Sequence, residues 1–364
     1  MISLRLKVTS DENEPYIVRV WTERPQSERR VDEAFEASLI SVSEDGLVFE
    51  GQERRITIHG VLPHDINGDV LFVNPKKGSA ERLIRRGSPH NTFLITERCD
   101  QLCVMCSQPP KENHVDMFPY FEAAALLAPQ NATIGLSGGE PTLYKEQLLG
   151  LLSRVMKERI DLQFHVLTNG QHFAEEDLPG LRSLALDRIT WGVPLYSADE
   201  NIHDKIVGKT GAYNVLLPNL GFMARAGFRI ELRTVLMQPN AEGLAELARF
   251  ITVMLPFIET WAIMQMENIG YGRMNWNSLF FDSSQHFENV ALALNTVHSR
   301  GLDAKLYNFP LCTVPEAYRN SAPATISDWK NSYLDECDGC SLQDACGGFF
   351  EWHPKNHGYG ALGL

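Results

Sequence analysis

The stretch TFLITERCDQLCVMCSQPP, Thr92–Pro110, places three cysteines in a short loop directly after an apolar run. Cys99, Cys103 and Cys106 have the spacing Cys-x3-Cys-x2-Cys. Three thiolates in one loop can hold three corners of an iron–sulfur cube and leave the fourth iron open to an exchangeable ligand. A structural zinc ion normally takes four ligands, and His114 could complete such a site. The loop therefore predicts a metal centre and leaves both alternatives open.

Apolar segments alternate with helical patterns from residue 90 onward. Strands are predicted at 92–96, 132–137, 162–168, 188–196, 229–237 and 261–267, with 304–309 as a candidate seventh. Apolar residues recur every three or four positions at 144–159, 213–227, 243–255 and 283–300, which predicts helices. Six or seven such units are fewer than the eight of a closed barrel. We therefore predict an α/β fold with a partial (β/α)6 TIM-like barrel, whose chemistry lies at the carboxyl ends of the strands.

The two flanks of this region have different patterns. Period-2 runs at 2–8, 16–22, 36–42, 46–51 and 55–61 predict a β-rich accessory domain over 1–85. The Gly, Pro and basic residues of 74–89 are typical of a linker. The barrel is predicted over 86–305. Residues 306–364 are poor in periodicity and rich in Cys, Gly and Pro, which predicts a separate C-terminal module.

The composition is that of a globular protein with an acidic surface. Of the 364 residues 44% are hydrophobic, and 33 Lys plus Arg against 46 Asp plus Glu give a net charge of −13. This charge repels a phosphate backbone, so we expect no nucleic-acid partner. We find neither a signal-peptide pattern nor an apolar run of about 18 residues, so no membrane association is expected. We expect a cytoplasmic protein whose clustered thiols bind metal rather than form disulfides.

The loop of Cys99, Cys103 and Cys106 after a first strand resembles the signature of the radical S-adenosylmethionine (SAM) enzymes. In that superfamily the open iron of a [4Fe–4S] cluster binds the amino and carboxylate groups of SAM. An electron from the reduced cluster splits SAM into methionine and a 5′-deoxyadenosyl radical. The resemblance spans residues 90–350 and implies a SAM-binding [4Fe–4S] cluster on these cysteines. Met105 departs from the family pattern, which commonly has an aromatic residue there to cover the adenine.

Segments after the next two strands extend this resemblance. GLSGGEPTLY contains Gly138, Gly139 and Glu140; glycines permit close backbone approach, and a carboxylate accepts from an ammonium group. By resemblance this motif binds the SAM amino group. Thr168 and Asn169 end the third strand, where they offer hydroxyl and amide groups to a ribose. A turn that uses the Asn-Gly pair explains that segment equally well.

Further SAM contacts are implied after the later strands. VPLYSADENIHDKIVGKTGAY resembles the family's Ser-x-Asp…His-Asp-x-Ile-x-Gly segment and offers Ser197 and Lys209 to the SAM carboxylate. Arg233 faces either that carboxylate or solvent. Gln265 and Met266 follow the sixth strand, where the family places groups against adenine.

A second set of cysteines lies near the C-terminus. Cys337-x2-Cys340-x5-Cys346 resembles the auxiliary-cluster modules called SPASM and Twitch, and Cys312 offers a fourth thiol. Four thiolates would close a second, auxiliary [4Fe–4S] cluster, and a zinc knuckle is the alternative. Without Cys312 the second cluster would stay open, as in the molybdopterin-precursor cyclases that hold a small-molecule substrate there.

The whole arrangement resembles the His-Xaa-Ser system radical SAM maturases. This resemblance implies an enzyme that modifies a ribosomally synthesised precursor peptide. A second radical SAM protein and a flavodoxin or ferredoxin-type electron donor are its implied partners. The β-rich domain would then recognise a leader segment by strand addition to an exposed edge, or serve as a structural cap. The alternatives are a small-molecule radical SAM enzyme of cofactor biosynthesis and a zinc-stabilised binding protein without catalytic activity.

Overall fold

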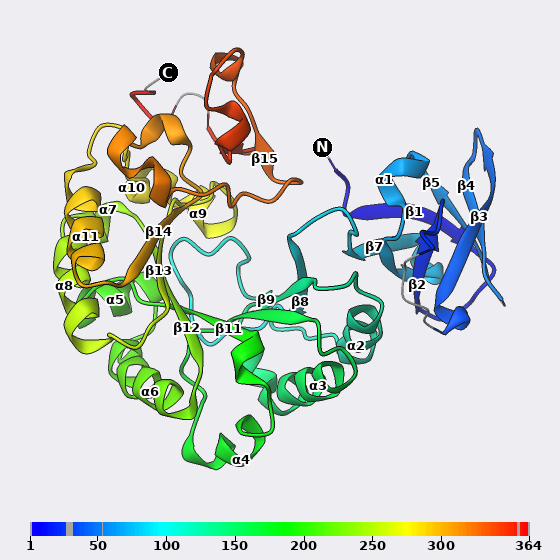
Figure 1. Ribbon diagram of the computed structural model, residues 1–364, viewed down its shortest axis with the longest axis horizontal. Coiled ribbons are helices and arrows are strands. Elements are labelled where there is room, and N and C mark those ends of the chain that lie inside the picture. Colours follow the sequence, from blue (N-terminus) through cyan, green and yellow to red (C-terminus); the bar gives the residue numbers. More distant parts are fainter. Residues whose placement is uncertain (1, 27–31, 53, 355–356, 363–364) are drawn as a thin grey trace. The chain divides into compact units, whose positions relative to one another are not determined.

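The computed structural model describes residues 2–26, 32–52, 54–354 and 357–362. The chain divides into two compact units (Figure 1). The first comprises Met1–Ile95, Val115–Ser137 and Tyr144–His165, and the second comprises Thr96–His114, Gly138–Leu143 and Val166–Leu364. This division into units does not test the predicted domain boundaries after residues 85 and 305, which stay predictions.

The N-terminal part of the first unit is a closed β-barrel, drawn in blue in Figure 1. Its ring order is β1-β5-β4-β3-β2-β6-β7. The strands are β1 (Arg5–Ser10), β2 (Tyr16–Trp21), β3 (Glu36–Ser43), β4 (Gly46–Glu50), β5 (Arg55–His59), β6 (Val70–Asn74) and β7 (Ser79–Ile84). A short helix, α1 (Pro63–Ile66), precedes β6. The prediction of a β-rich N-terminal region is confirmed.

The predicted linker over 74–89 is wrong, because residues 79–84 form β7. Ala80, Arg82 and Ile84 are its buried positions, so the strand has the expected alternation with a charged residue at one inward site. The Arg82 guanidinium is accommodated there because its Nε donates to Asp69 Oδ2 at 2.7 Å. Arg82 is thus a buried strand residue, although its basic side chain is of a kind that is typical of solvated linkers.

The barrel encloses one apolar core, to which Val20, Phe49 and Ile58 contribute fully buried side chains. β1 pairs with both β5 and β7, which closes the ring. Each of the seven described strands thus has a neighbour on either side. Strand addition needs a free sheet edge, so the closed ring favours the structural-cap alternative for this part of the chain.

The central sheet has seven strands in the order β14-β13-β12-β11-β10-β9-β8. They are β8 (Asn91–Thr96), β9 (Thr133–Gly138), β10 (Gln163–Leu167), β11 (Ile189–Pro194), β12 (Arg229–Val235), β13 (Thr260–Met264) and β14 (Asp303–Tyr307). The ladders from β11 to β14 are parallel. The α/β prediction is confirmed, and the candidate seventh strand is present as β14.

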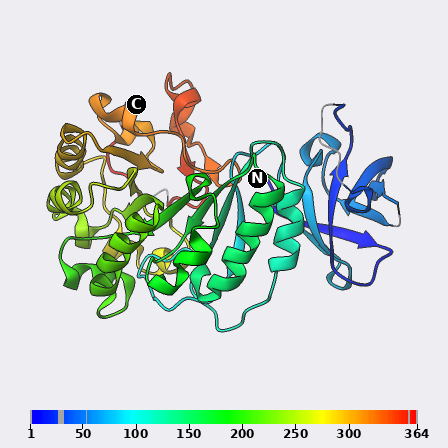
Figure 2. The same ribbon diagram turned by 60° about the horizontal axis from the view of Figure 1, so that its bottom comes forward.

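Helices separate most of these strands along the chain. The longer ones are α2 (Phe118–Leu126), α3 (Lys145–Glu158), α5 (Glu200–Val207), α6 (Ala212–Ala226), α8 (Leu244–Met254) and α11 (Glu288–Ser299). The shorter ones are α4 (Leu178–Leu181), α7 (Gln238–Ala241), α9 (Gly270–Met274) and α10 (Trp276–Leu279). In the second unit, α8 and α11 pack against each other on the outer side of β12–β14 (Figures 1 and 2). The four predicted helices correspond to α3, α6, α8 and α11.

The C-terminal segment has little regular structure. Short 3-10 turns connect to a two-stranded antiparallel sheet of β15 (Asn331–Ser332) and β16 (Phe349–Phe350). Among the described residues, no helix combines the length and apolar character that a membrane crossing requires.

Candidate functional site

Backbone hydrogen bonds to the helices α5 and α9 hold the loop of Cys99, Cys103 and Cys106. The amides of Leu102 and Val104 donate to the carbonyl groups of Val207 and Ile206, at 3.0 and 2.9 Å, at the end of α5. On the other side, the amide of Tyr271 in α9 donates to Cys106 O at 2.8 Å. The loop is therefore fixed by the protein at both its middle and its end.

Two glycines permit this close packing. The amide of Gly139 donates to Thr96 O at 2.7 Å, and a Cβ at Gly139 would collide with the carbonyl of Arg98. Gly208 ends α5 in the left-handed conformation, and a Cβ there would lie 2.5 Å from Leu102 O. In this structure the two glycines thus let neighbouring loops meet the backbone of the cysteine loop.

The three thiols of this loop are part-buried and close enough to influence one another. Burial raises the pKa of the Cys99 thiol to about 11. Burial and then the charges of Cys106 and Cys99 raise the pKa of the Cys103 thiol to about 12. Burial also raises the pKa of Cys106. The thiols are thus protonated at neutral pH in the metal-free chain and must lose their protons when they ligate a metal.

Glu140 is enclosed by the protein, with 1% of its surface exposed. Its Oε1 accepts from the Thr142 amide at 2.9 Å, from the Thr168 hydroxyl at 2.7 Å and from the Thr142 hydroxyl. Its Oε2 accepts from the Asn169 amide at 2.5 Å. Burial raises the pKa of Glu140, against the effect of these hydrogen bonds. A carboxylate has about four acceptor positions, two on each oxygen. Oε1 already accepts three hydrogen bonds and Oε2 accepts one, so a further donor would have to bind to Oε2.

Asn169 connects the end of β10 to the cysteine loop. Its side-chain amide donates to Asp100 Oδ1 at 2.7 Å, and its Oδ1 accepts from the Gln171 amide at 3.1 Å. Asn169 and Thr168, both predicted to meet a ribose, are therefore engaged with protein partners here.

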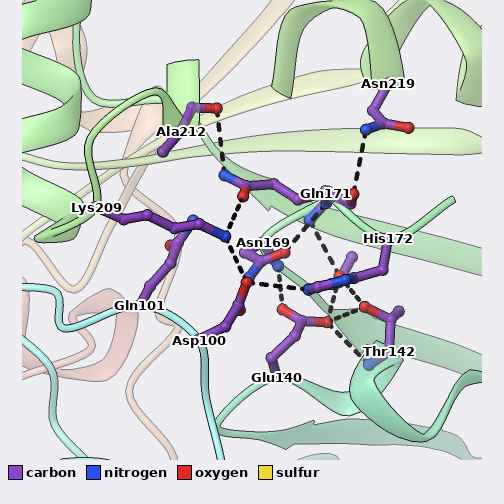
Figure 3. A network of polar contacts seen from close by, with 12 residues as sticks. Asp100, Gln101, Glu140, Thr142, Asn169, Gln171, His172, Lys209, Ala212 and Asn219 are labelled. Carbon is purple, nitrogen blue, oxygen red and sulfur yellow. Dashed lines mark hydrogen bonds and ion pairs between the residues drawn. The ribbon is translucent and has the colours of Figure 1, made fainter. Parts of the chain in front are cut away.

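Asp100 is the centre of the polar network in Figure 3. Its Oδ2 accepts from Lys209 Nζ at 2.6 Å and lies 3.3 Å from His172 Nε2. Partial burial raises the pKa of the Asp100 carboxyl, but the hydrogen bonds of His172 and Lys209 outweigh it and hold that pKa well below its usual range. Lys209 also donates to Gln171 Oε1 at 2.9 Å. We did not predict Asp100, Gln171 or His172 from the sequence, although all three are polar residues beside predicted motifs.

Ser197 and Arg233, the other predicted carboxylate contacts, have protein partners too. Ser197 is buried, and its hydroxyl accepts from the Asp199 amide at 3.0 Å in the turn that starts α5. Arg233 Nη1 donates to Glu231 Oε1 at 2.5 Å on the same strand. Glu231 Oε2 also accepts from Tyr307 at 3.1 Å.

An apolar cluster lies against the cysteine loop. It joins Met105 and Met266, both considered for the adenine, with Tyr196 and Trp276, and Cys103 packs against it. Gln265, one residue before Met266, is buried and donates to Ser283 at 2.7 Å. Its buried Oε1 has no hydrogen-bond partner among the described residues, so a ligand N–H could satisfy it. Tyr196 was not predicted; it is buried, and the thiols of Cys103 and Cys106 help to raise its pKa.

The structure brings Cys312 beside the other C-terminal cysteines. Burial, and then the charges of Cys346, Cys337 and Cys340, raise the pKa of Cys312 to about 12. The Leu311 amide, next to Cys312, donates to Cys346 Sγ at 3.3 Å. The Cys312 thiol is therefore near enough to the other three to feel their charges, and joint ligation of a cluster by the four thiols stays a prediction.

In the part of the chain that the structure describes, no three His, Cys, Asp or Glu side chains converge as ligands of a single metal ion. A cubic cluster distributes its thiolates over separate irons. Two sets of spaced, part-buried thiols and the unpaired Gln265 Oε1 therefore fit the groups that the sequence resemblance implies.

Residues 93–251 match the family model described as the radical SAM superfamily. Among solved structures, the chain is similar to Streptococcus suis SuiB bound to S-adenosylmethionine, with a TM-score of 0.50 and 15% identity. The alignment covers 61% of this chain and 51% of that chain, so the chain spans about half the length of SuiB. At this identity the likeness shows the fold alone.

Two further structures are less similar. SuiB bound to the precursor peptide SuiA has a TM-score of 0.49, 16% identity and coverage of 61% of this chain and 49% of that chain. A radical SAM methyltransferase from Sphaerobacter thermophilus has a TM-score of 0.44, 14% identity and coverage of 71% and 72%. No curated protein sequence matches. The family match and the fold together show that residues 93–251 are a radical SAM domain.

Proposed function

We propose that the chain is a radical SAM enzyme that cleaves SAM reductively at the loop of Cys99, Cys103 and Cys106. The observation that carries this proposal is the clamping of three part-buried thiols by backbone contacts in a radical SAM domain. Cys99, Cys103 and Cys106 would hold a [4Fe–4S] cluster, which would supply the electron for reductive cleavage of SAM. The chain's own contribution is to bind and orient SAM and to exclude water from the radical.

Several residues of the second unit have capacity for SAM. Gln265 Oε1 has a free acceptor position, and Met105 and Met266 offer an apolar surface for the adenine. The Lys209 ammonium has three N–H groups and uses two of them on Asp100 and Gln171, which leaves one for the SAM carboxylate. Glu140 Oε2 and the Gly138–Gly139 backbone are proposed for the amino group. Thr168, Asn169, Ser197 and Arg233 would each have to share or exchange a protein partner.

We further propose a cytoplasmic enzyme with a precursor peptide of the His-Xaa-Ser type as its substrate. The sequence resemblance of the cysteine loop and tail to the His-Xaa-Ser maturases supports this assignment. The place of Cys312 beside the other three C-terminal thiols is a second support, because four ligands close an auxiliary [4Fe–4S] cluster. A closed cluster leaves no iron for a small-molecule substrate, in contrast to the cyclase alternative. A second radical SAM protein and a flavodoxin or ferredoxin-type donor complete the proposal.

Anaerobic co-expression with a peptide that carries His-Xaa-Ser repeats tests the substrate assignment. We expect mass spectrometry of that peptide to show a mass change with the wild-type chain. The variant with Cys99, Cys103 and Cys106 all changed to Ala should leave the peptide unmodified. An unmodified peptide with a wild-type chain that cleaves SAM would contradict the peptide assignment and leave the radical SAM assignment standing.

A further inference from the structure

We propose that Asp100 and Lys209 form a compensated charge pair that positions the cysteine loop and sets the net charge felt at the first iron–sulfur cluster. Asp100 acts through other groups, as a positioning residue, and Lys209 has this role in addition to its proposed contact with the SAM carboxylate. The inference rests on the proposed cluster at Cys99, Cys103 and Cys106, and it assigns a role to the network of Figure 3.

The placement of Asp100 is the first observation. It follows Cys99 directly and accepts hydrogen bonds from Asn169, after β10, and from Lys209, after α5. One carboxylate thus ties the first cysteine to two loops that are distant in the sequence. Its side chain is 25% exposed, so solvent screens this pair less than it screens a fully exposed one.

The position of the Lys209 ammonium is also fixed. Gln171 Oε1 accepts from it at 2.9 Å, and Gln171 Nε2 is in turn held by Ala212 O at 3.2 Å. Isolated surface ion pairs contribute little because their long side chains are free to move. This lysine has two acceptors in defined places, so its charge stays beside that of Asp100.

The Asp100 carboxylate lies beside the proposed cluster ligands, because Asp100 is the chain neighbour of Cys99 and is held there by Asn169 and Lys209. A carboxylate that disfavours a thiolate also disfavours the added electron of a reduced cluster. The ammonium 2.6 Å from Asp100 offsets that effect, and His172 Nε2 lies 3.3 Å from the same carboxylate. Removal of Lys209 therefore weakens the compensation of Asp100, and removal of Asp100 leaves the Lys209 charge uncompensated.

The two single substitutions therefore have opposite expected effects. Asp100→Asn leaves the Lys209 cation uncompensated and should raise the reduction potential of the first cluster. Lys209→Met leaves the Asp100 anion with His172 as its remaining charged neighbour and should lower that potential. The double variant should return close to the wild-type potential, because both charges are then absent.

The test is a redox titration of the full chain, reconstituted anaerobically and followed by electron paramagnetic resonance. The signal that changes when SAM is added belongs to the first cluster, since SAM requires the open iron. Glu175→Gln is the matched control, because it removes a carboxylate from an exposed ion pair with Arg225 at 3.1 Å. We expect no shift in that variant.

Potentials that stay unchanged, or that shift in the same direction in both single variants, would overturn the proposal. If one single variant fails to load the first cluster, the other variant alone tests the proposal. A shift of its reduction potential in the expected direction supports the proposal, and a shift in the opposite direction overturns it. If neither loads it while the auxiliary iron is retained, the positioning role is supported. A wild-type chain without any SAM-responsive cluster would instead refute the proposed function, so the two failures are distinguishable.

Discussion

At the scale of single residues, the candidate site is built from polar groups that other protein groups already satisfy. Glu140 shows this most clearly, because its four donors come from Thr142, Thr168 and Asn169. A buried carboxylate without such partners would be strongly destabilising. Glu140 therefore organises the loops around the cysteines whether or not it also contacts SAM.

Glu140→Gln should lower the free energy of unfolding by about 1–3 kcal/mol, because an NH2 group would replace one acceptor oxygen and face donors. Denaturant unfolding of the metal-free chain measures this change. Glu175→Gln serves as the exposed control and should stay within about 0.5 kcal/mol of the wild type. Equal stabilities of the Glu140 and Glu175 variants would contradict the enclosed role of Glu140.

The cysteine thiols provide a second prediction at this scale. In the metal-free chain, Cys99 and Cys103 have pKa values of about 11 and about 12, so few thiolates exist at pH 8. We expect both to react with iodoacetamide far more slowly than glutathione does, with a rate that rises about tenfold per pH unit. Mass spectrometry of the labelled peptides follows the reaction. Labelling at the glutathione rate at pH 8 would show that the loop is not packed as described.

At the scale of elements, Arg159 connects the carboxyl end of α2 to the chain that follows α3. Its buried guanidinium donates to the carbonyls of Leu126, the last residue of α2, and of Ala128, at 2.8 and 2.9 Å. Asp161 pairs with Arg159 at 2.8 Å. The guanidinium that follows α3 thereby supplies donors at the carboxyl end of α2, where helix carbonyls lack intrahelical partners.

This contact predicts a dependence of stability on pH. The hydrogen bond from Arg159 is the largest influence on the pKa of Asp161, and it holds that pKa below its usual value of about 4. The unfolded chain then binds more protons in this range, so the contribution of Asp161 is present above about pH 4 and is lost as the pH falls further. Asp161→Asn should remove this part of the acid sensitivity. Thermal unfolding midpoints at pH 7 and pH 3 compare the two proteins, and identical acid-induced decreases would contradict the expectation.

Periodicity predicted most of the strands and four of the longer helices, and it missed α2, α5, β6 and β7. The helices α3, α6, α8 and α11 and the strands β8–β14 were all predicted. β7 was missed because Arg82 occupies an inward position that only Asp69 makes tolerable. No local pattern can reveal such a partner, since Asp69 lies just before β6, 13 residues from Arg82 in the sequence.

At the scale of the whole molecule, the cysteines were predictable because their chemistry is encoded in their spacing. The network around them was not, since it depends on loops that meet in three dimensions. Asp100, Gln171 and Lys209 lie far apart in the sequence and form one hydrogen-bonded set. Tyr196 likewise became evident from its burial beside the thiols.

The grouping of Cys312 with the C-terminal cysteines gives a prediction at this scale. Cys312→Ala should lose part of the bound iron, because a closed auxiliary cluster needs its fourth thiolate. SAM should still bind, since Cys99, Cys103 and Cys106 are unchanged. Iron analysis and SAM binding of the reconstituted variant measure the two effects. Wild-type iron content would contradict ligation by Cys312.

The most direct test of the central claim is reductive SAM cleavage by the anaerobically reconstituted chain, with dithionite as electron source and 5′-deoxyadenosine as the measured product. We predict product formation by the wild-type chain and by Glu175→Gln. The variant with Cys99, Cys103 and Cys106 changed to Ala should form none, although it retains the iron of the C-terminal set. Formation of 5′-deoxyadenosine by that triple variant, or its absence from a wild-type chain loaded with both clusters, would contradict the account.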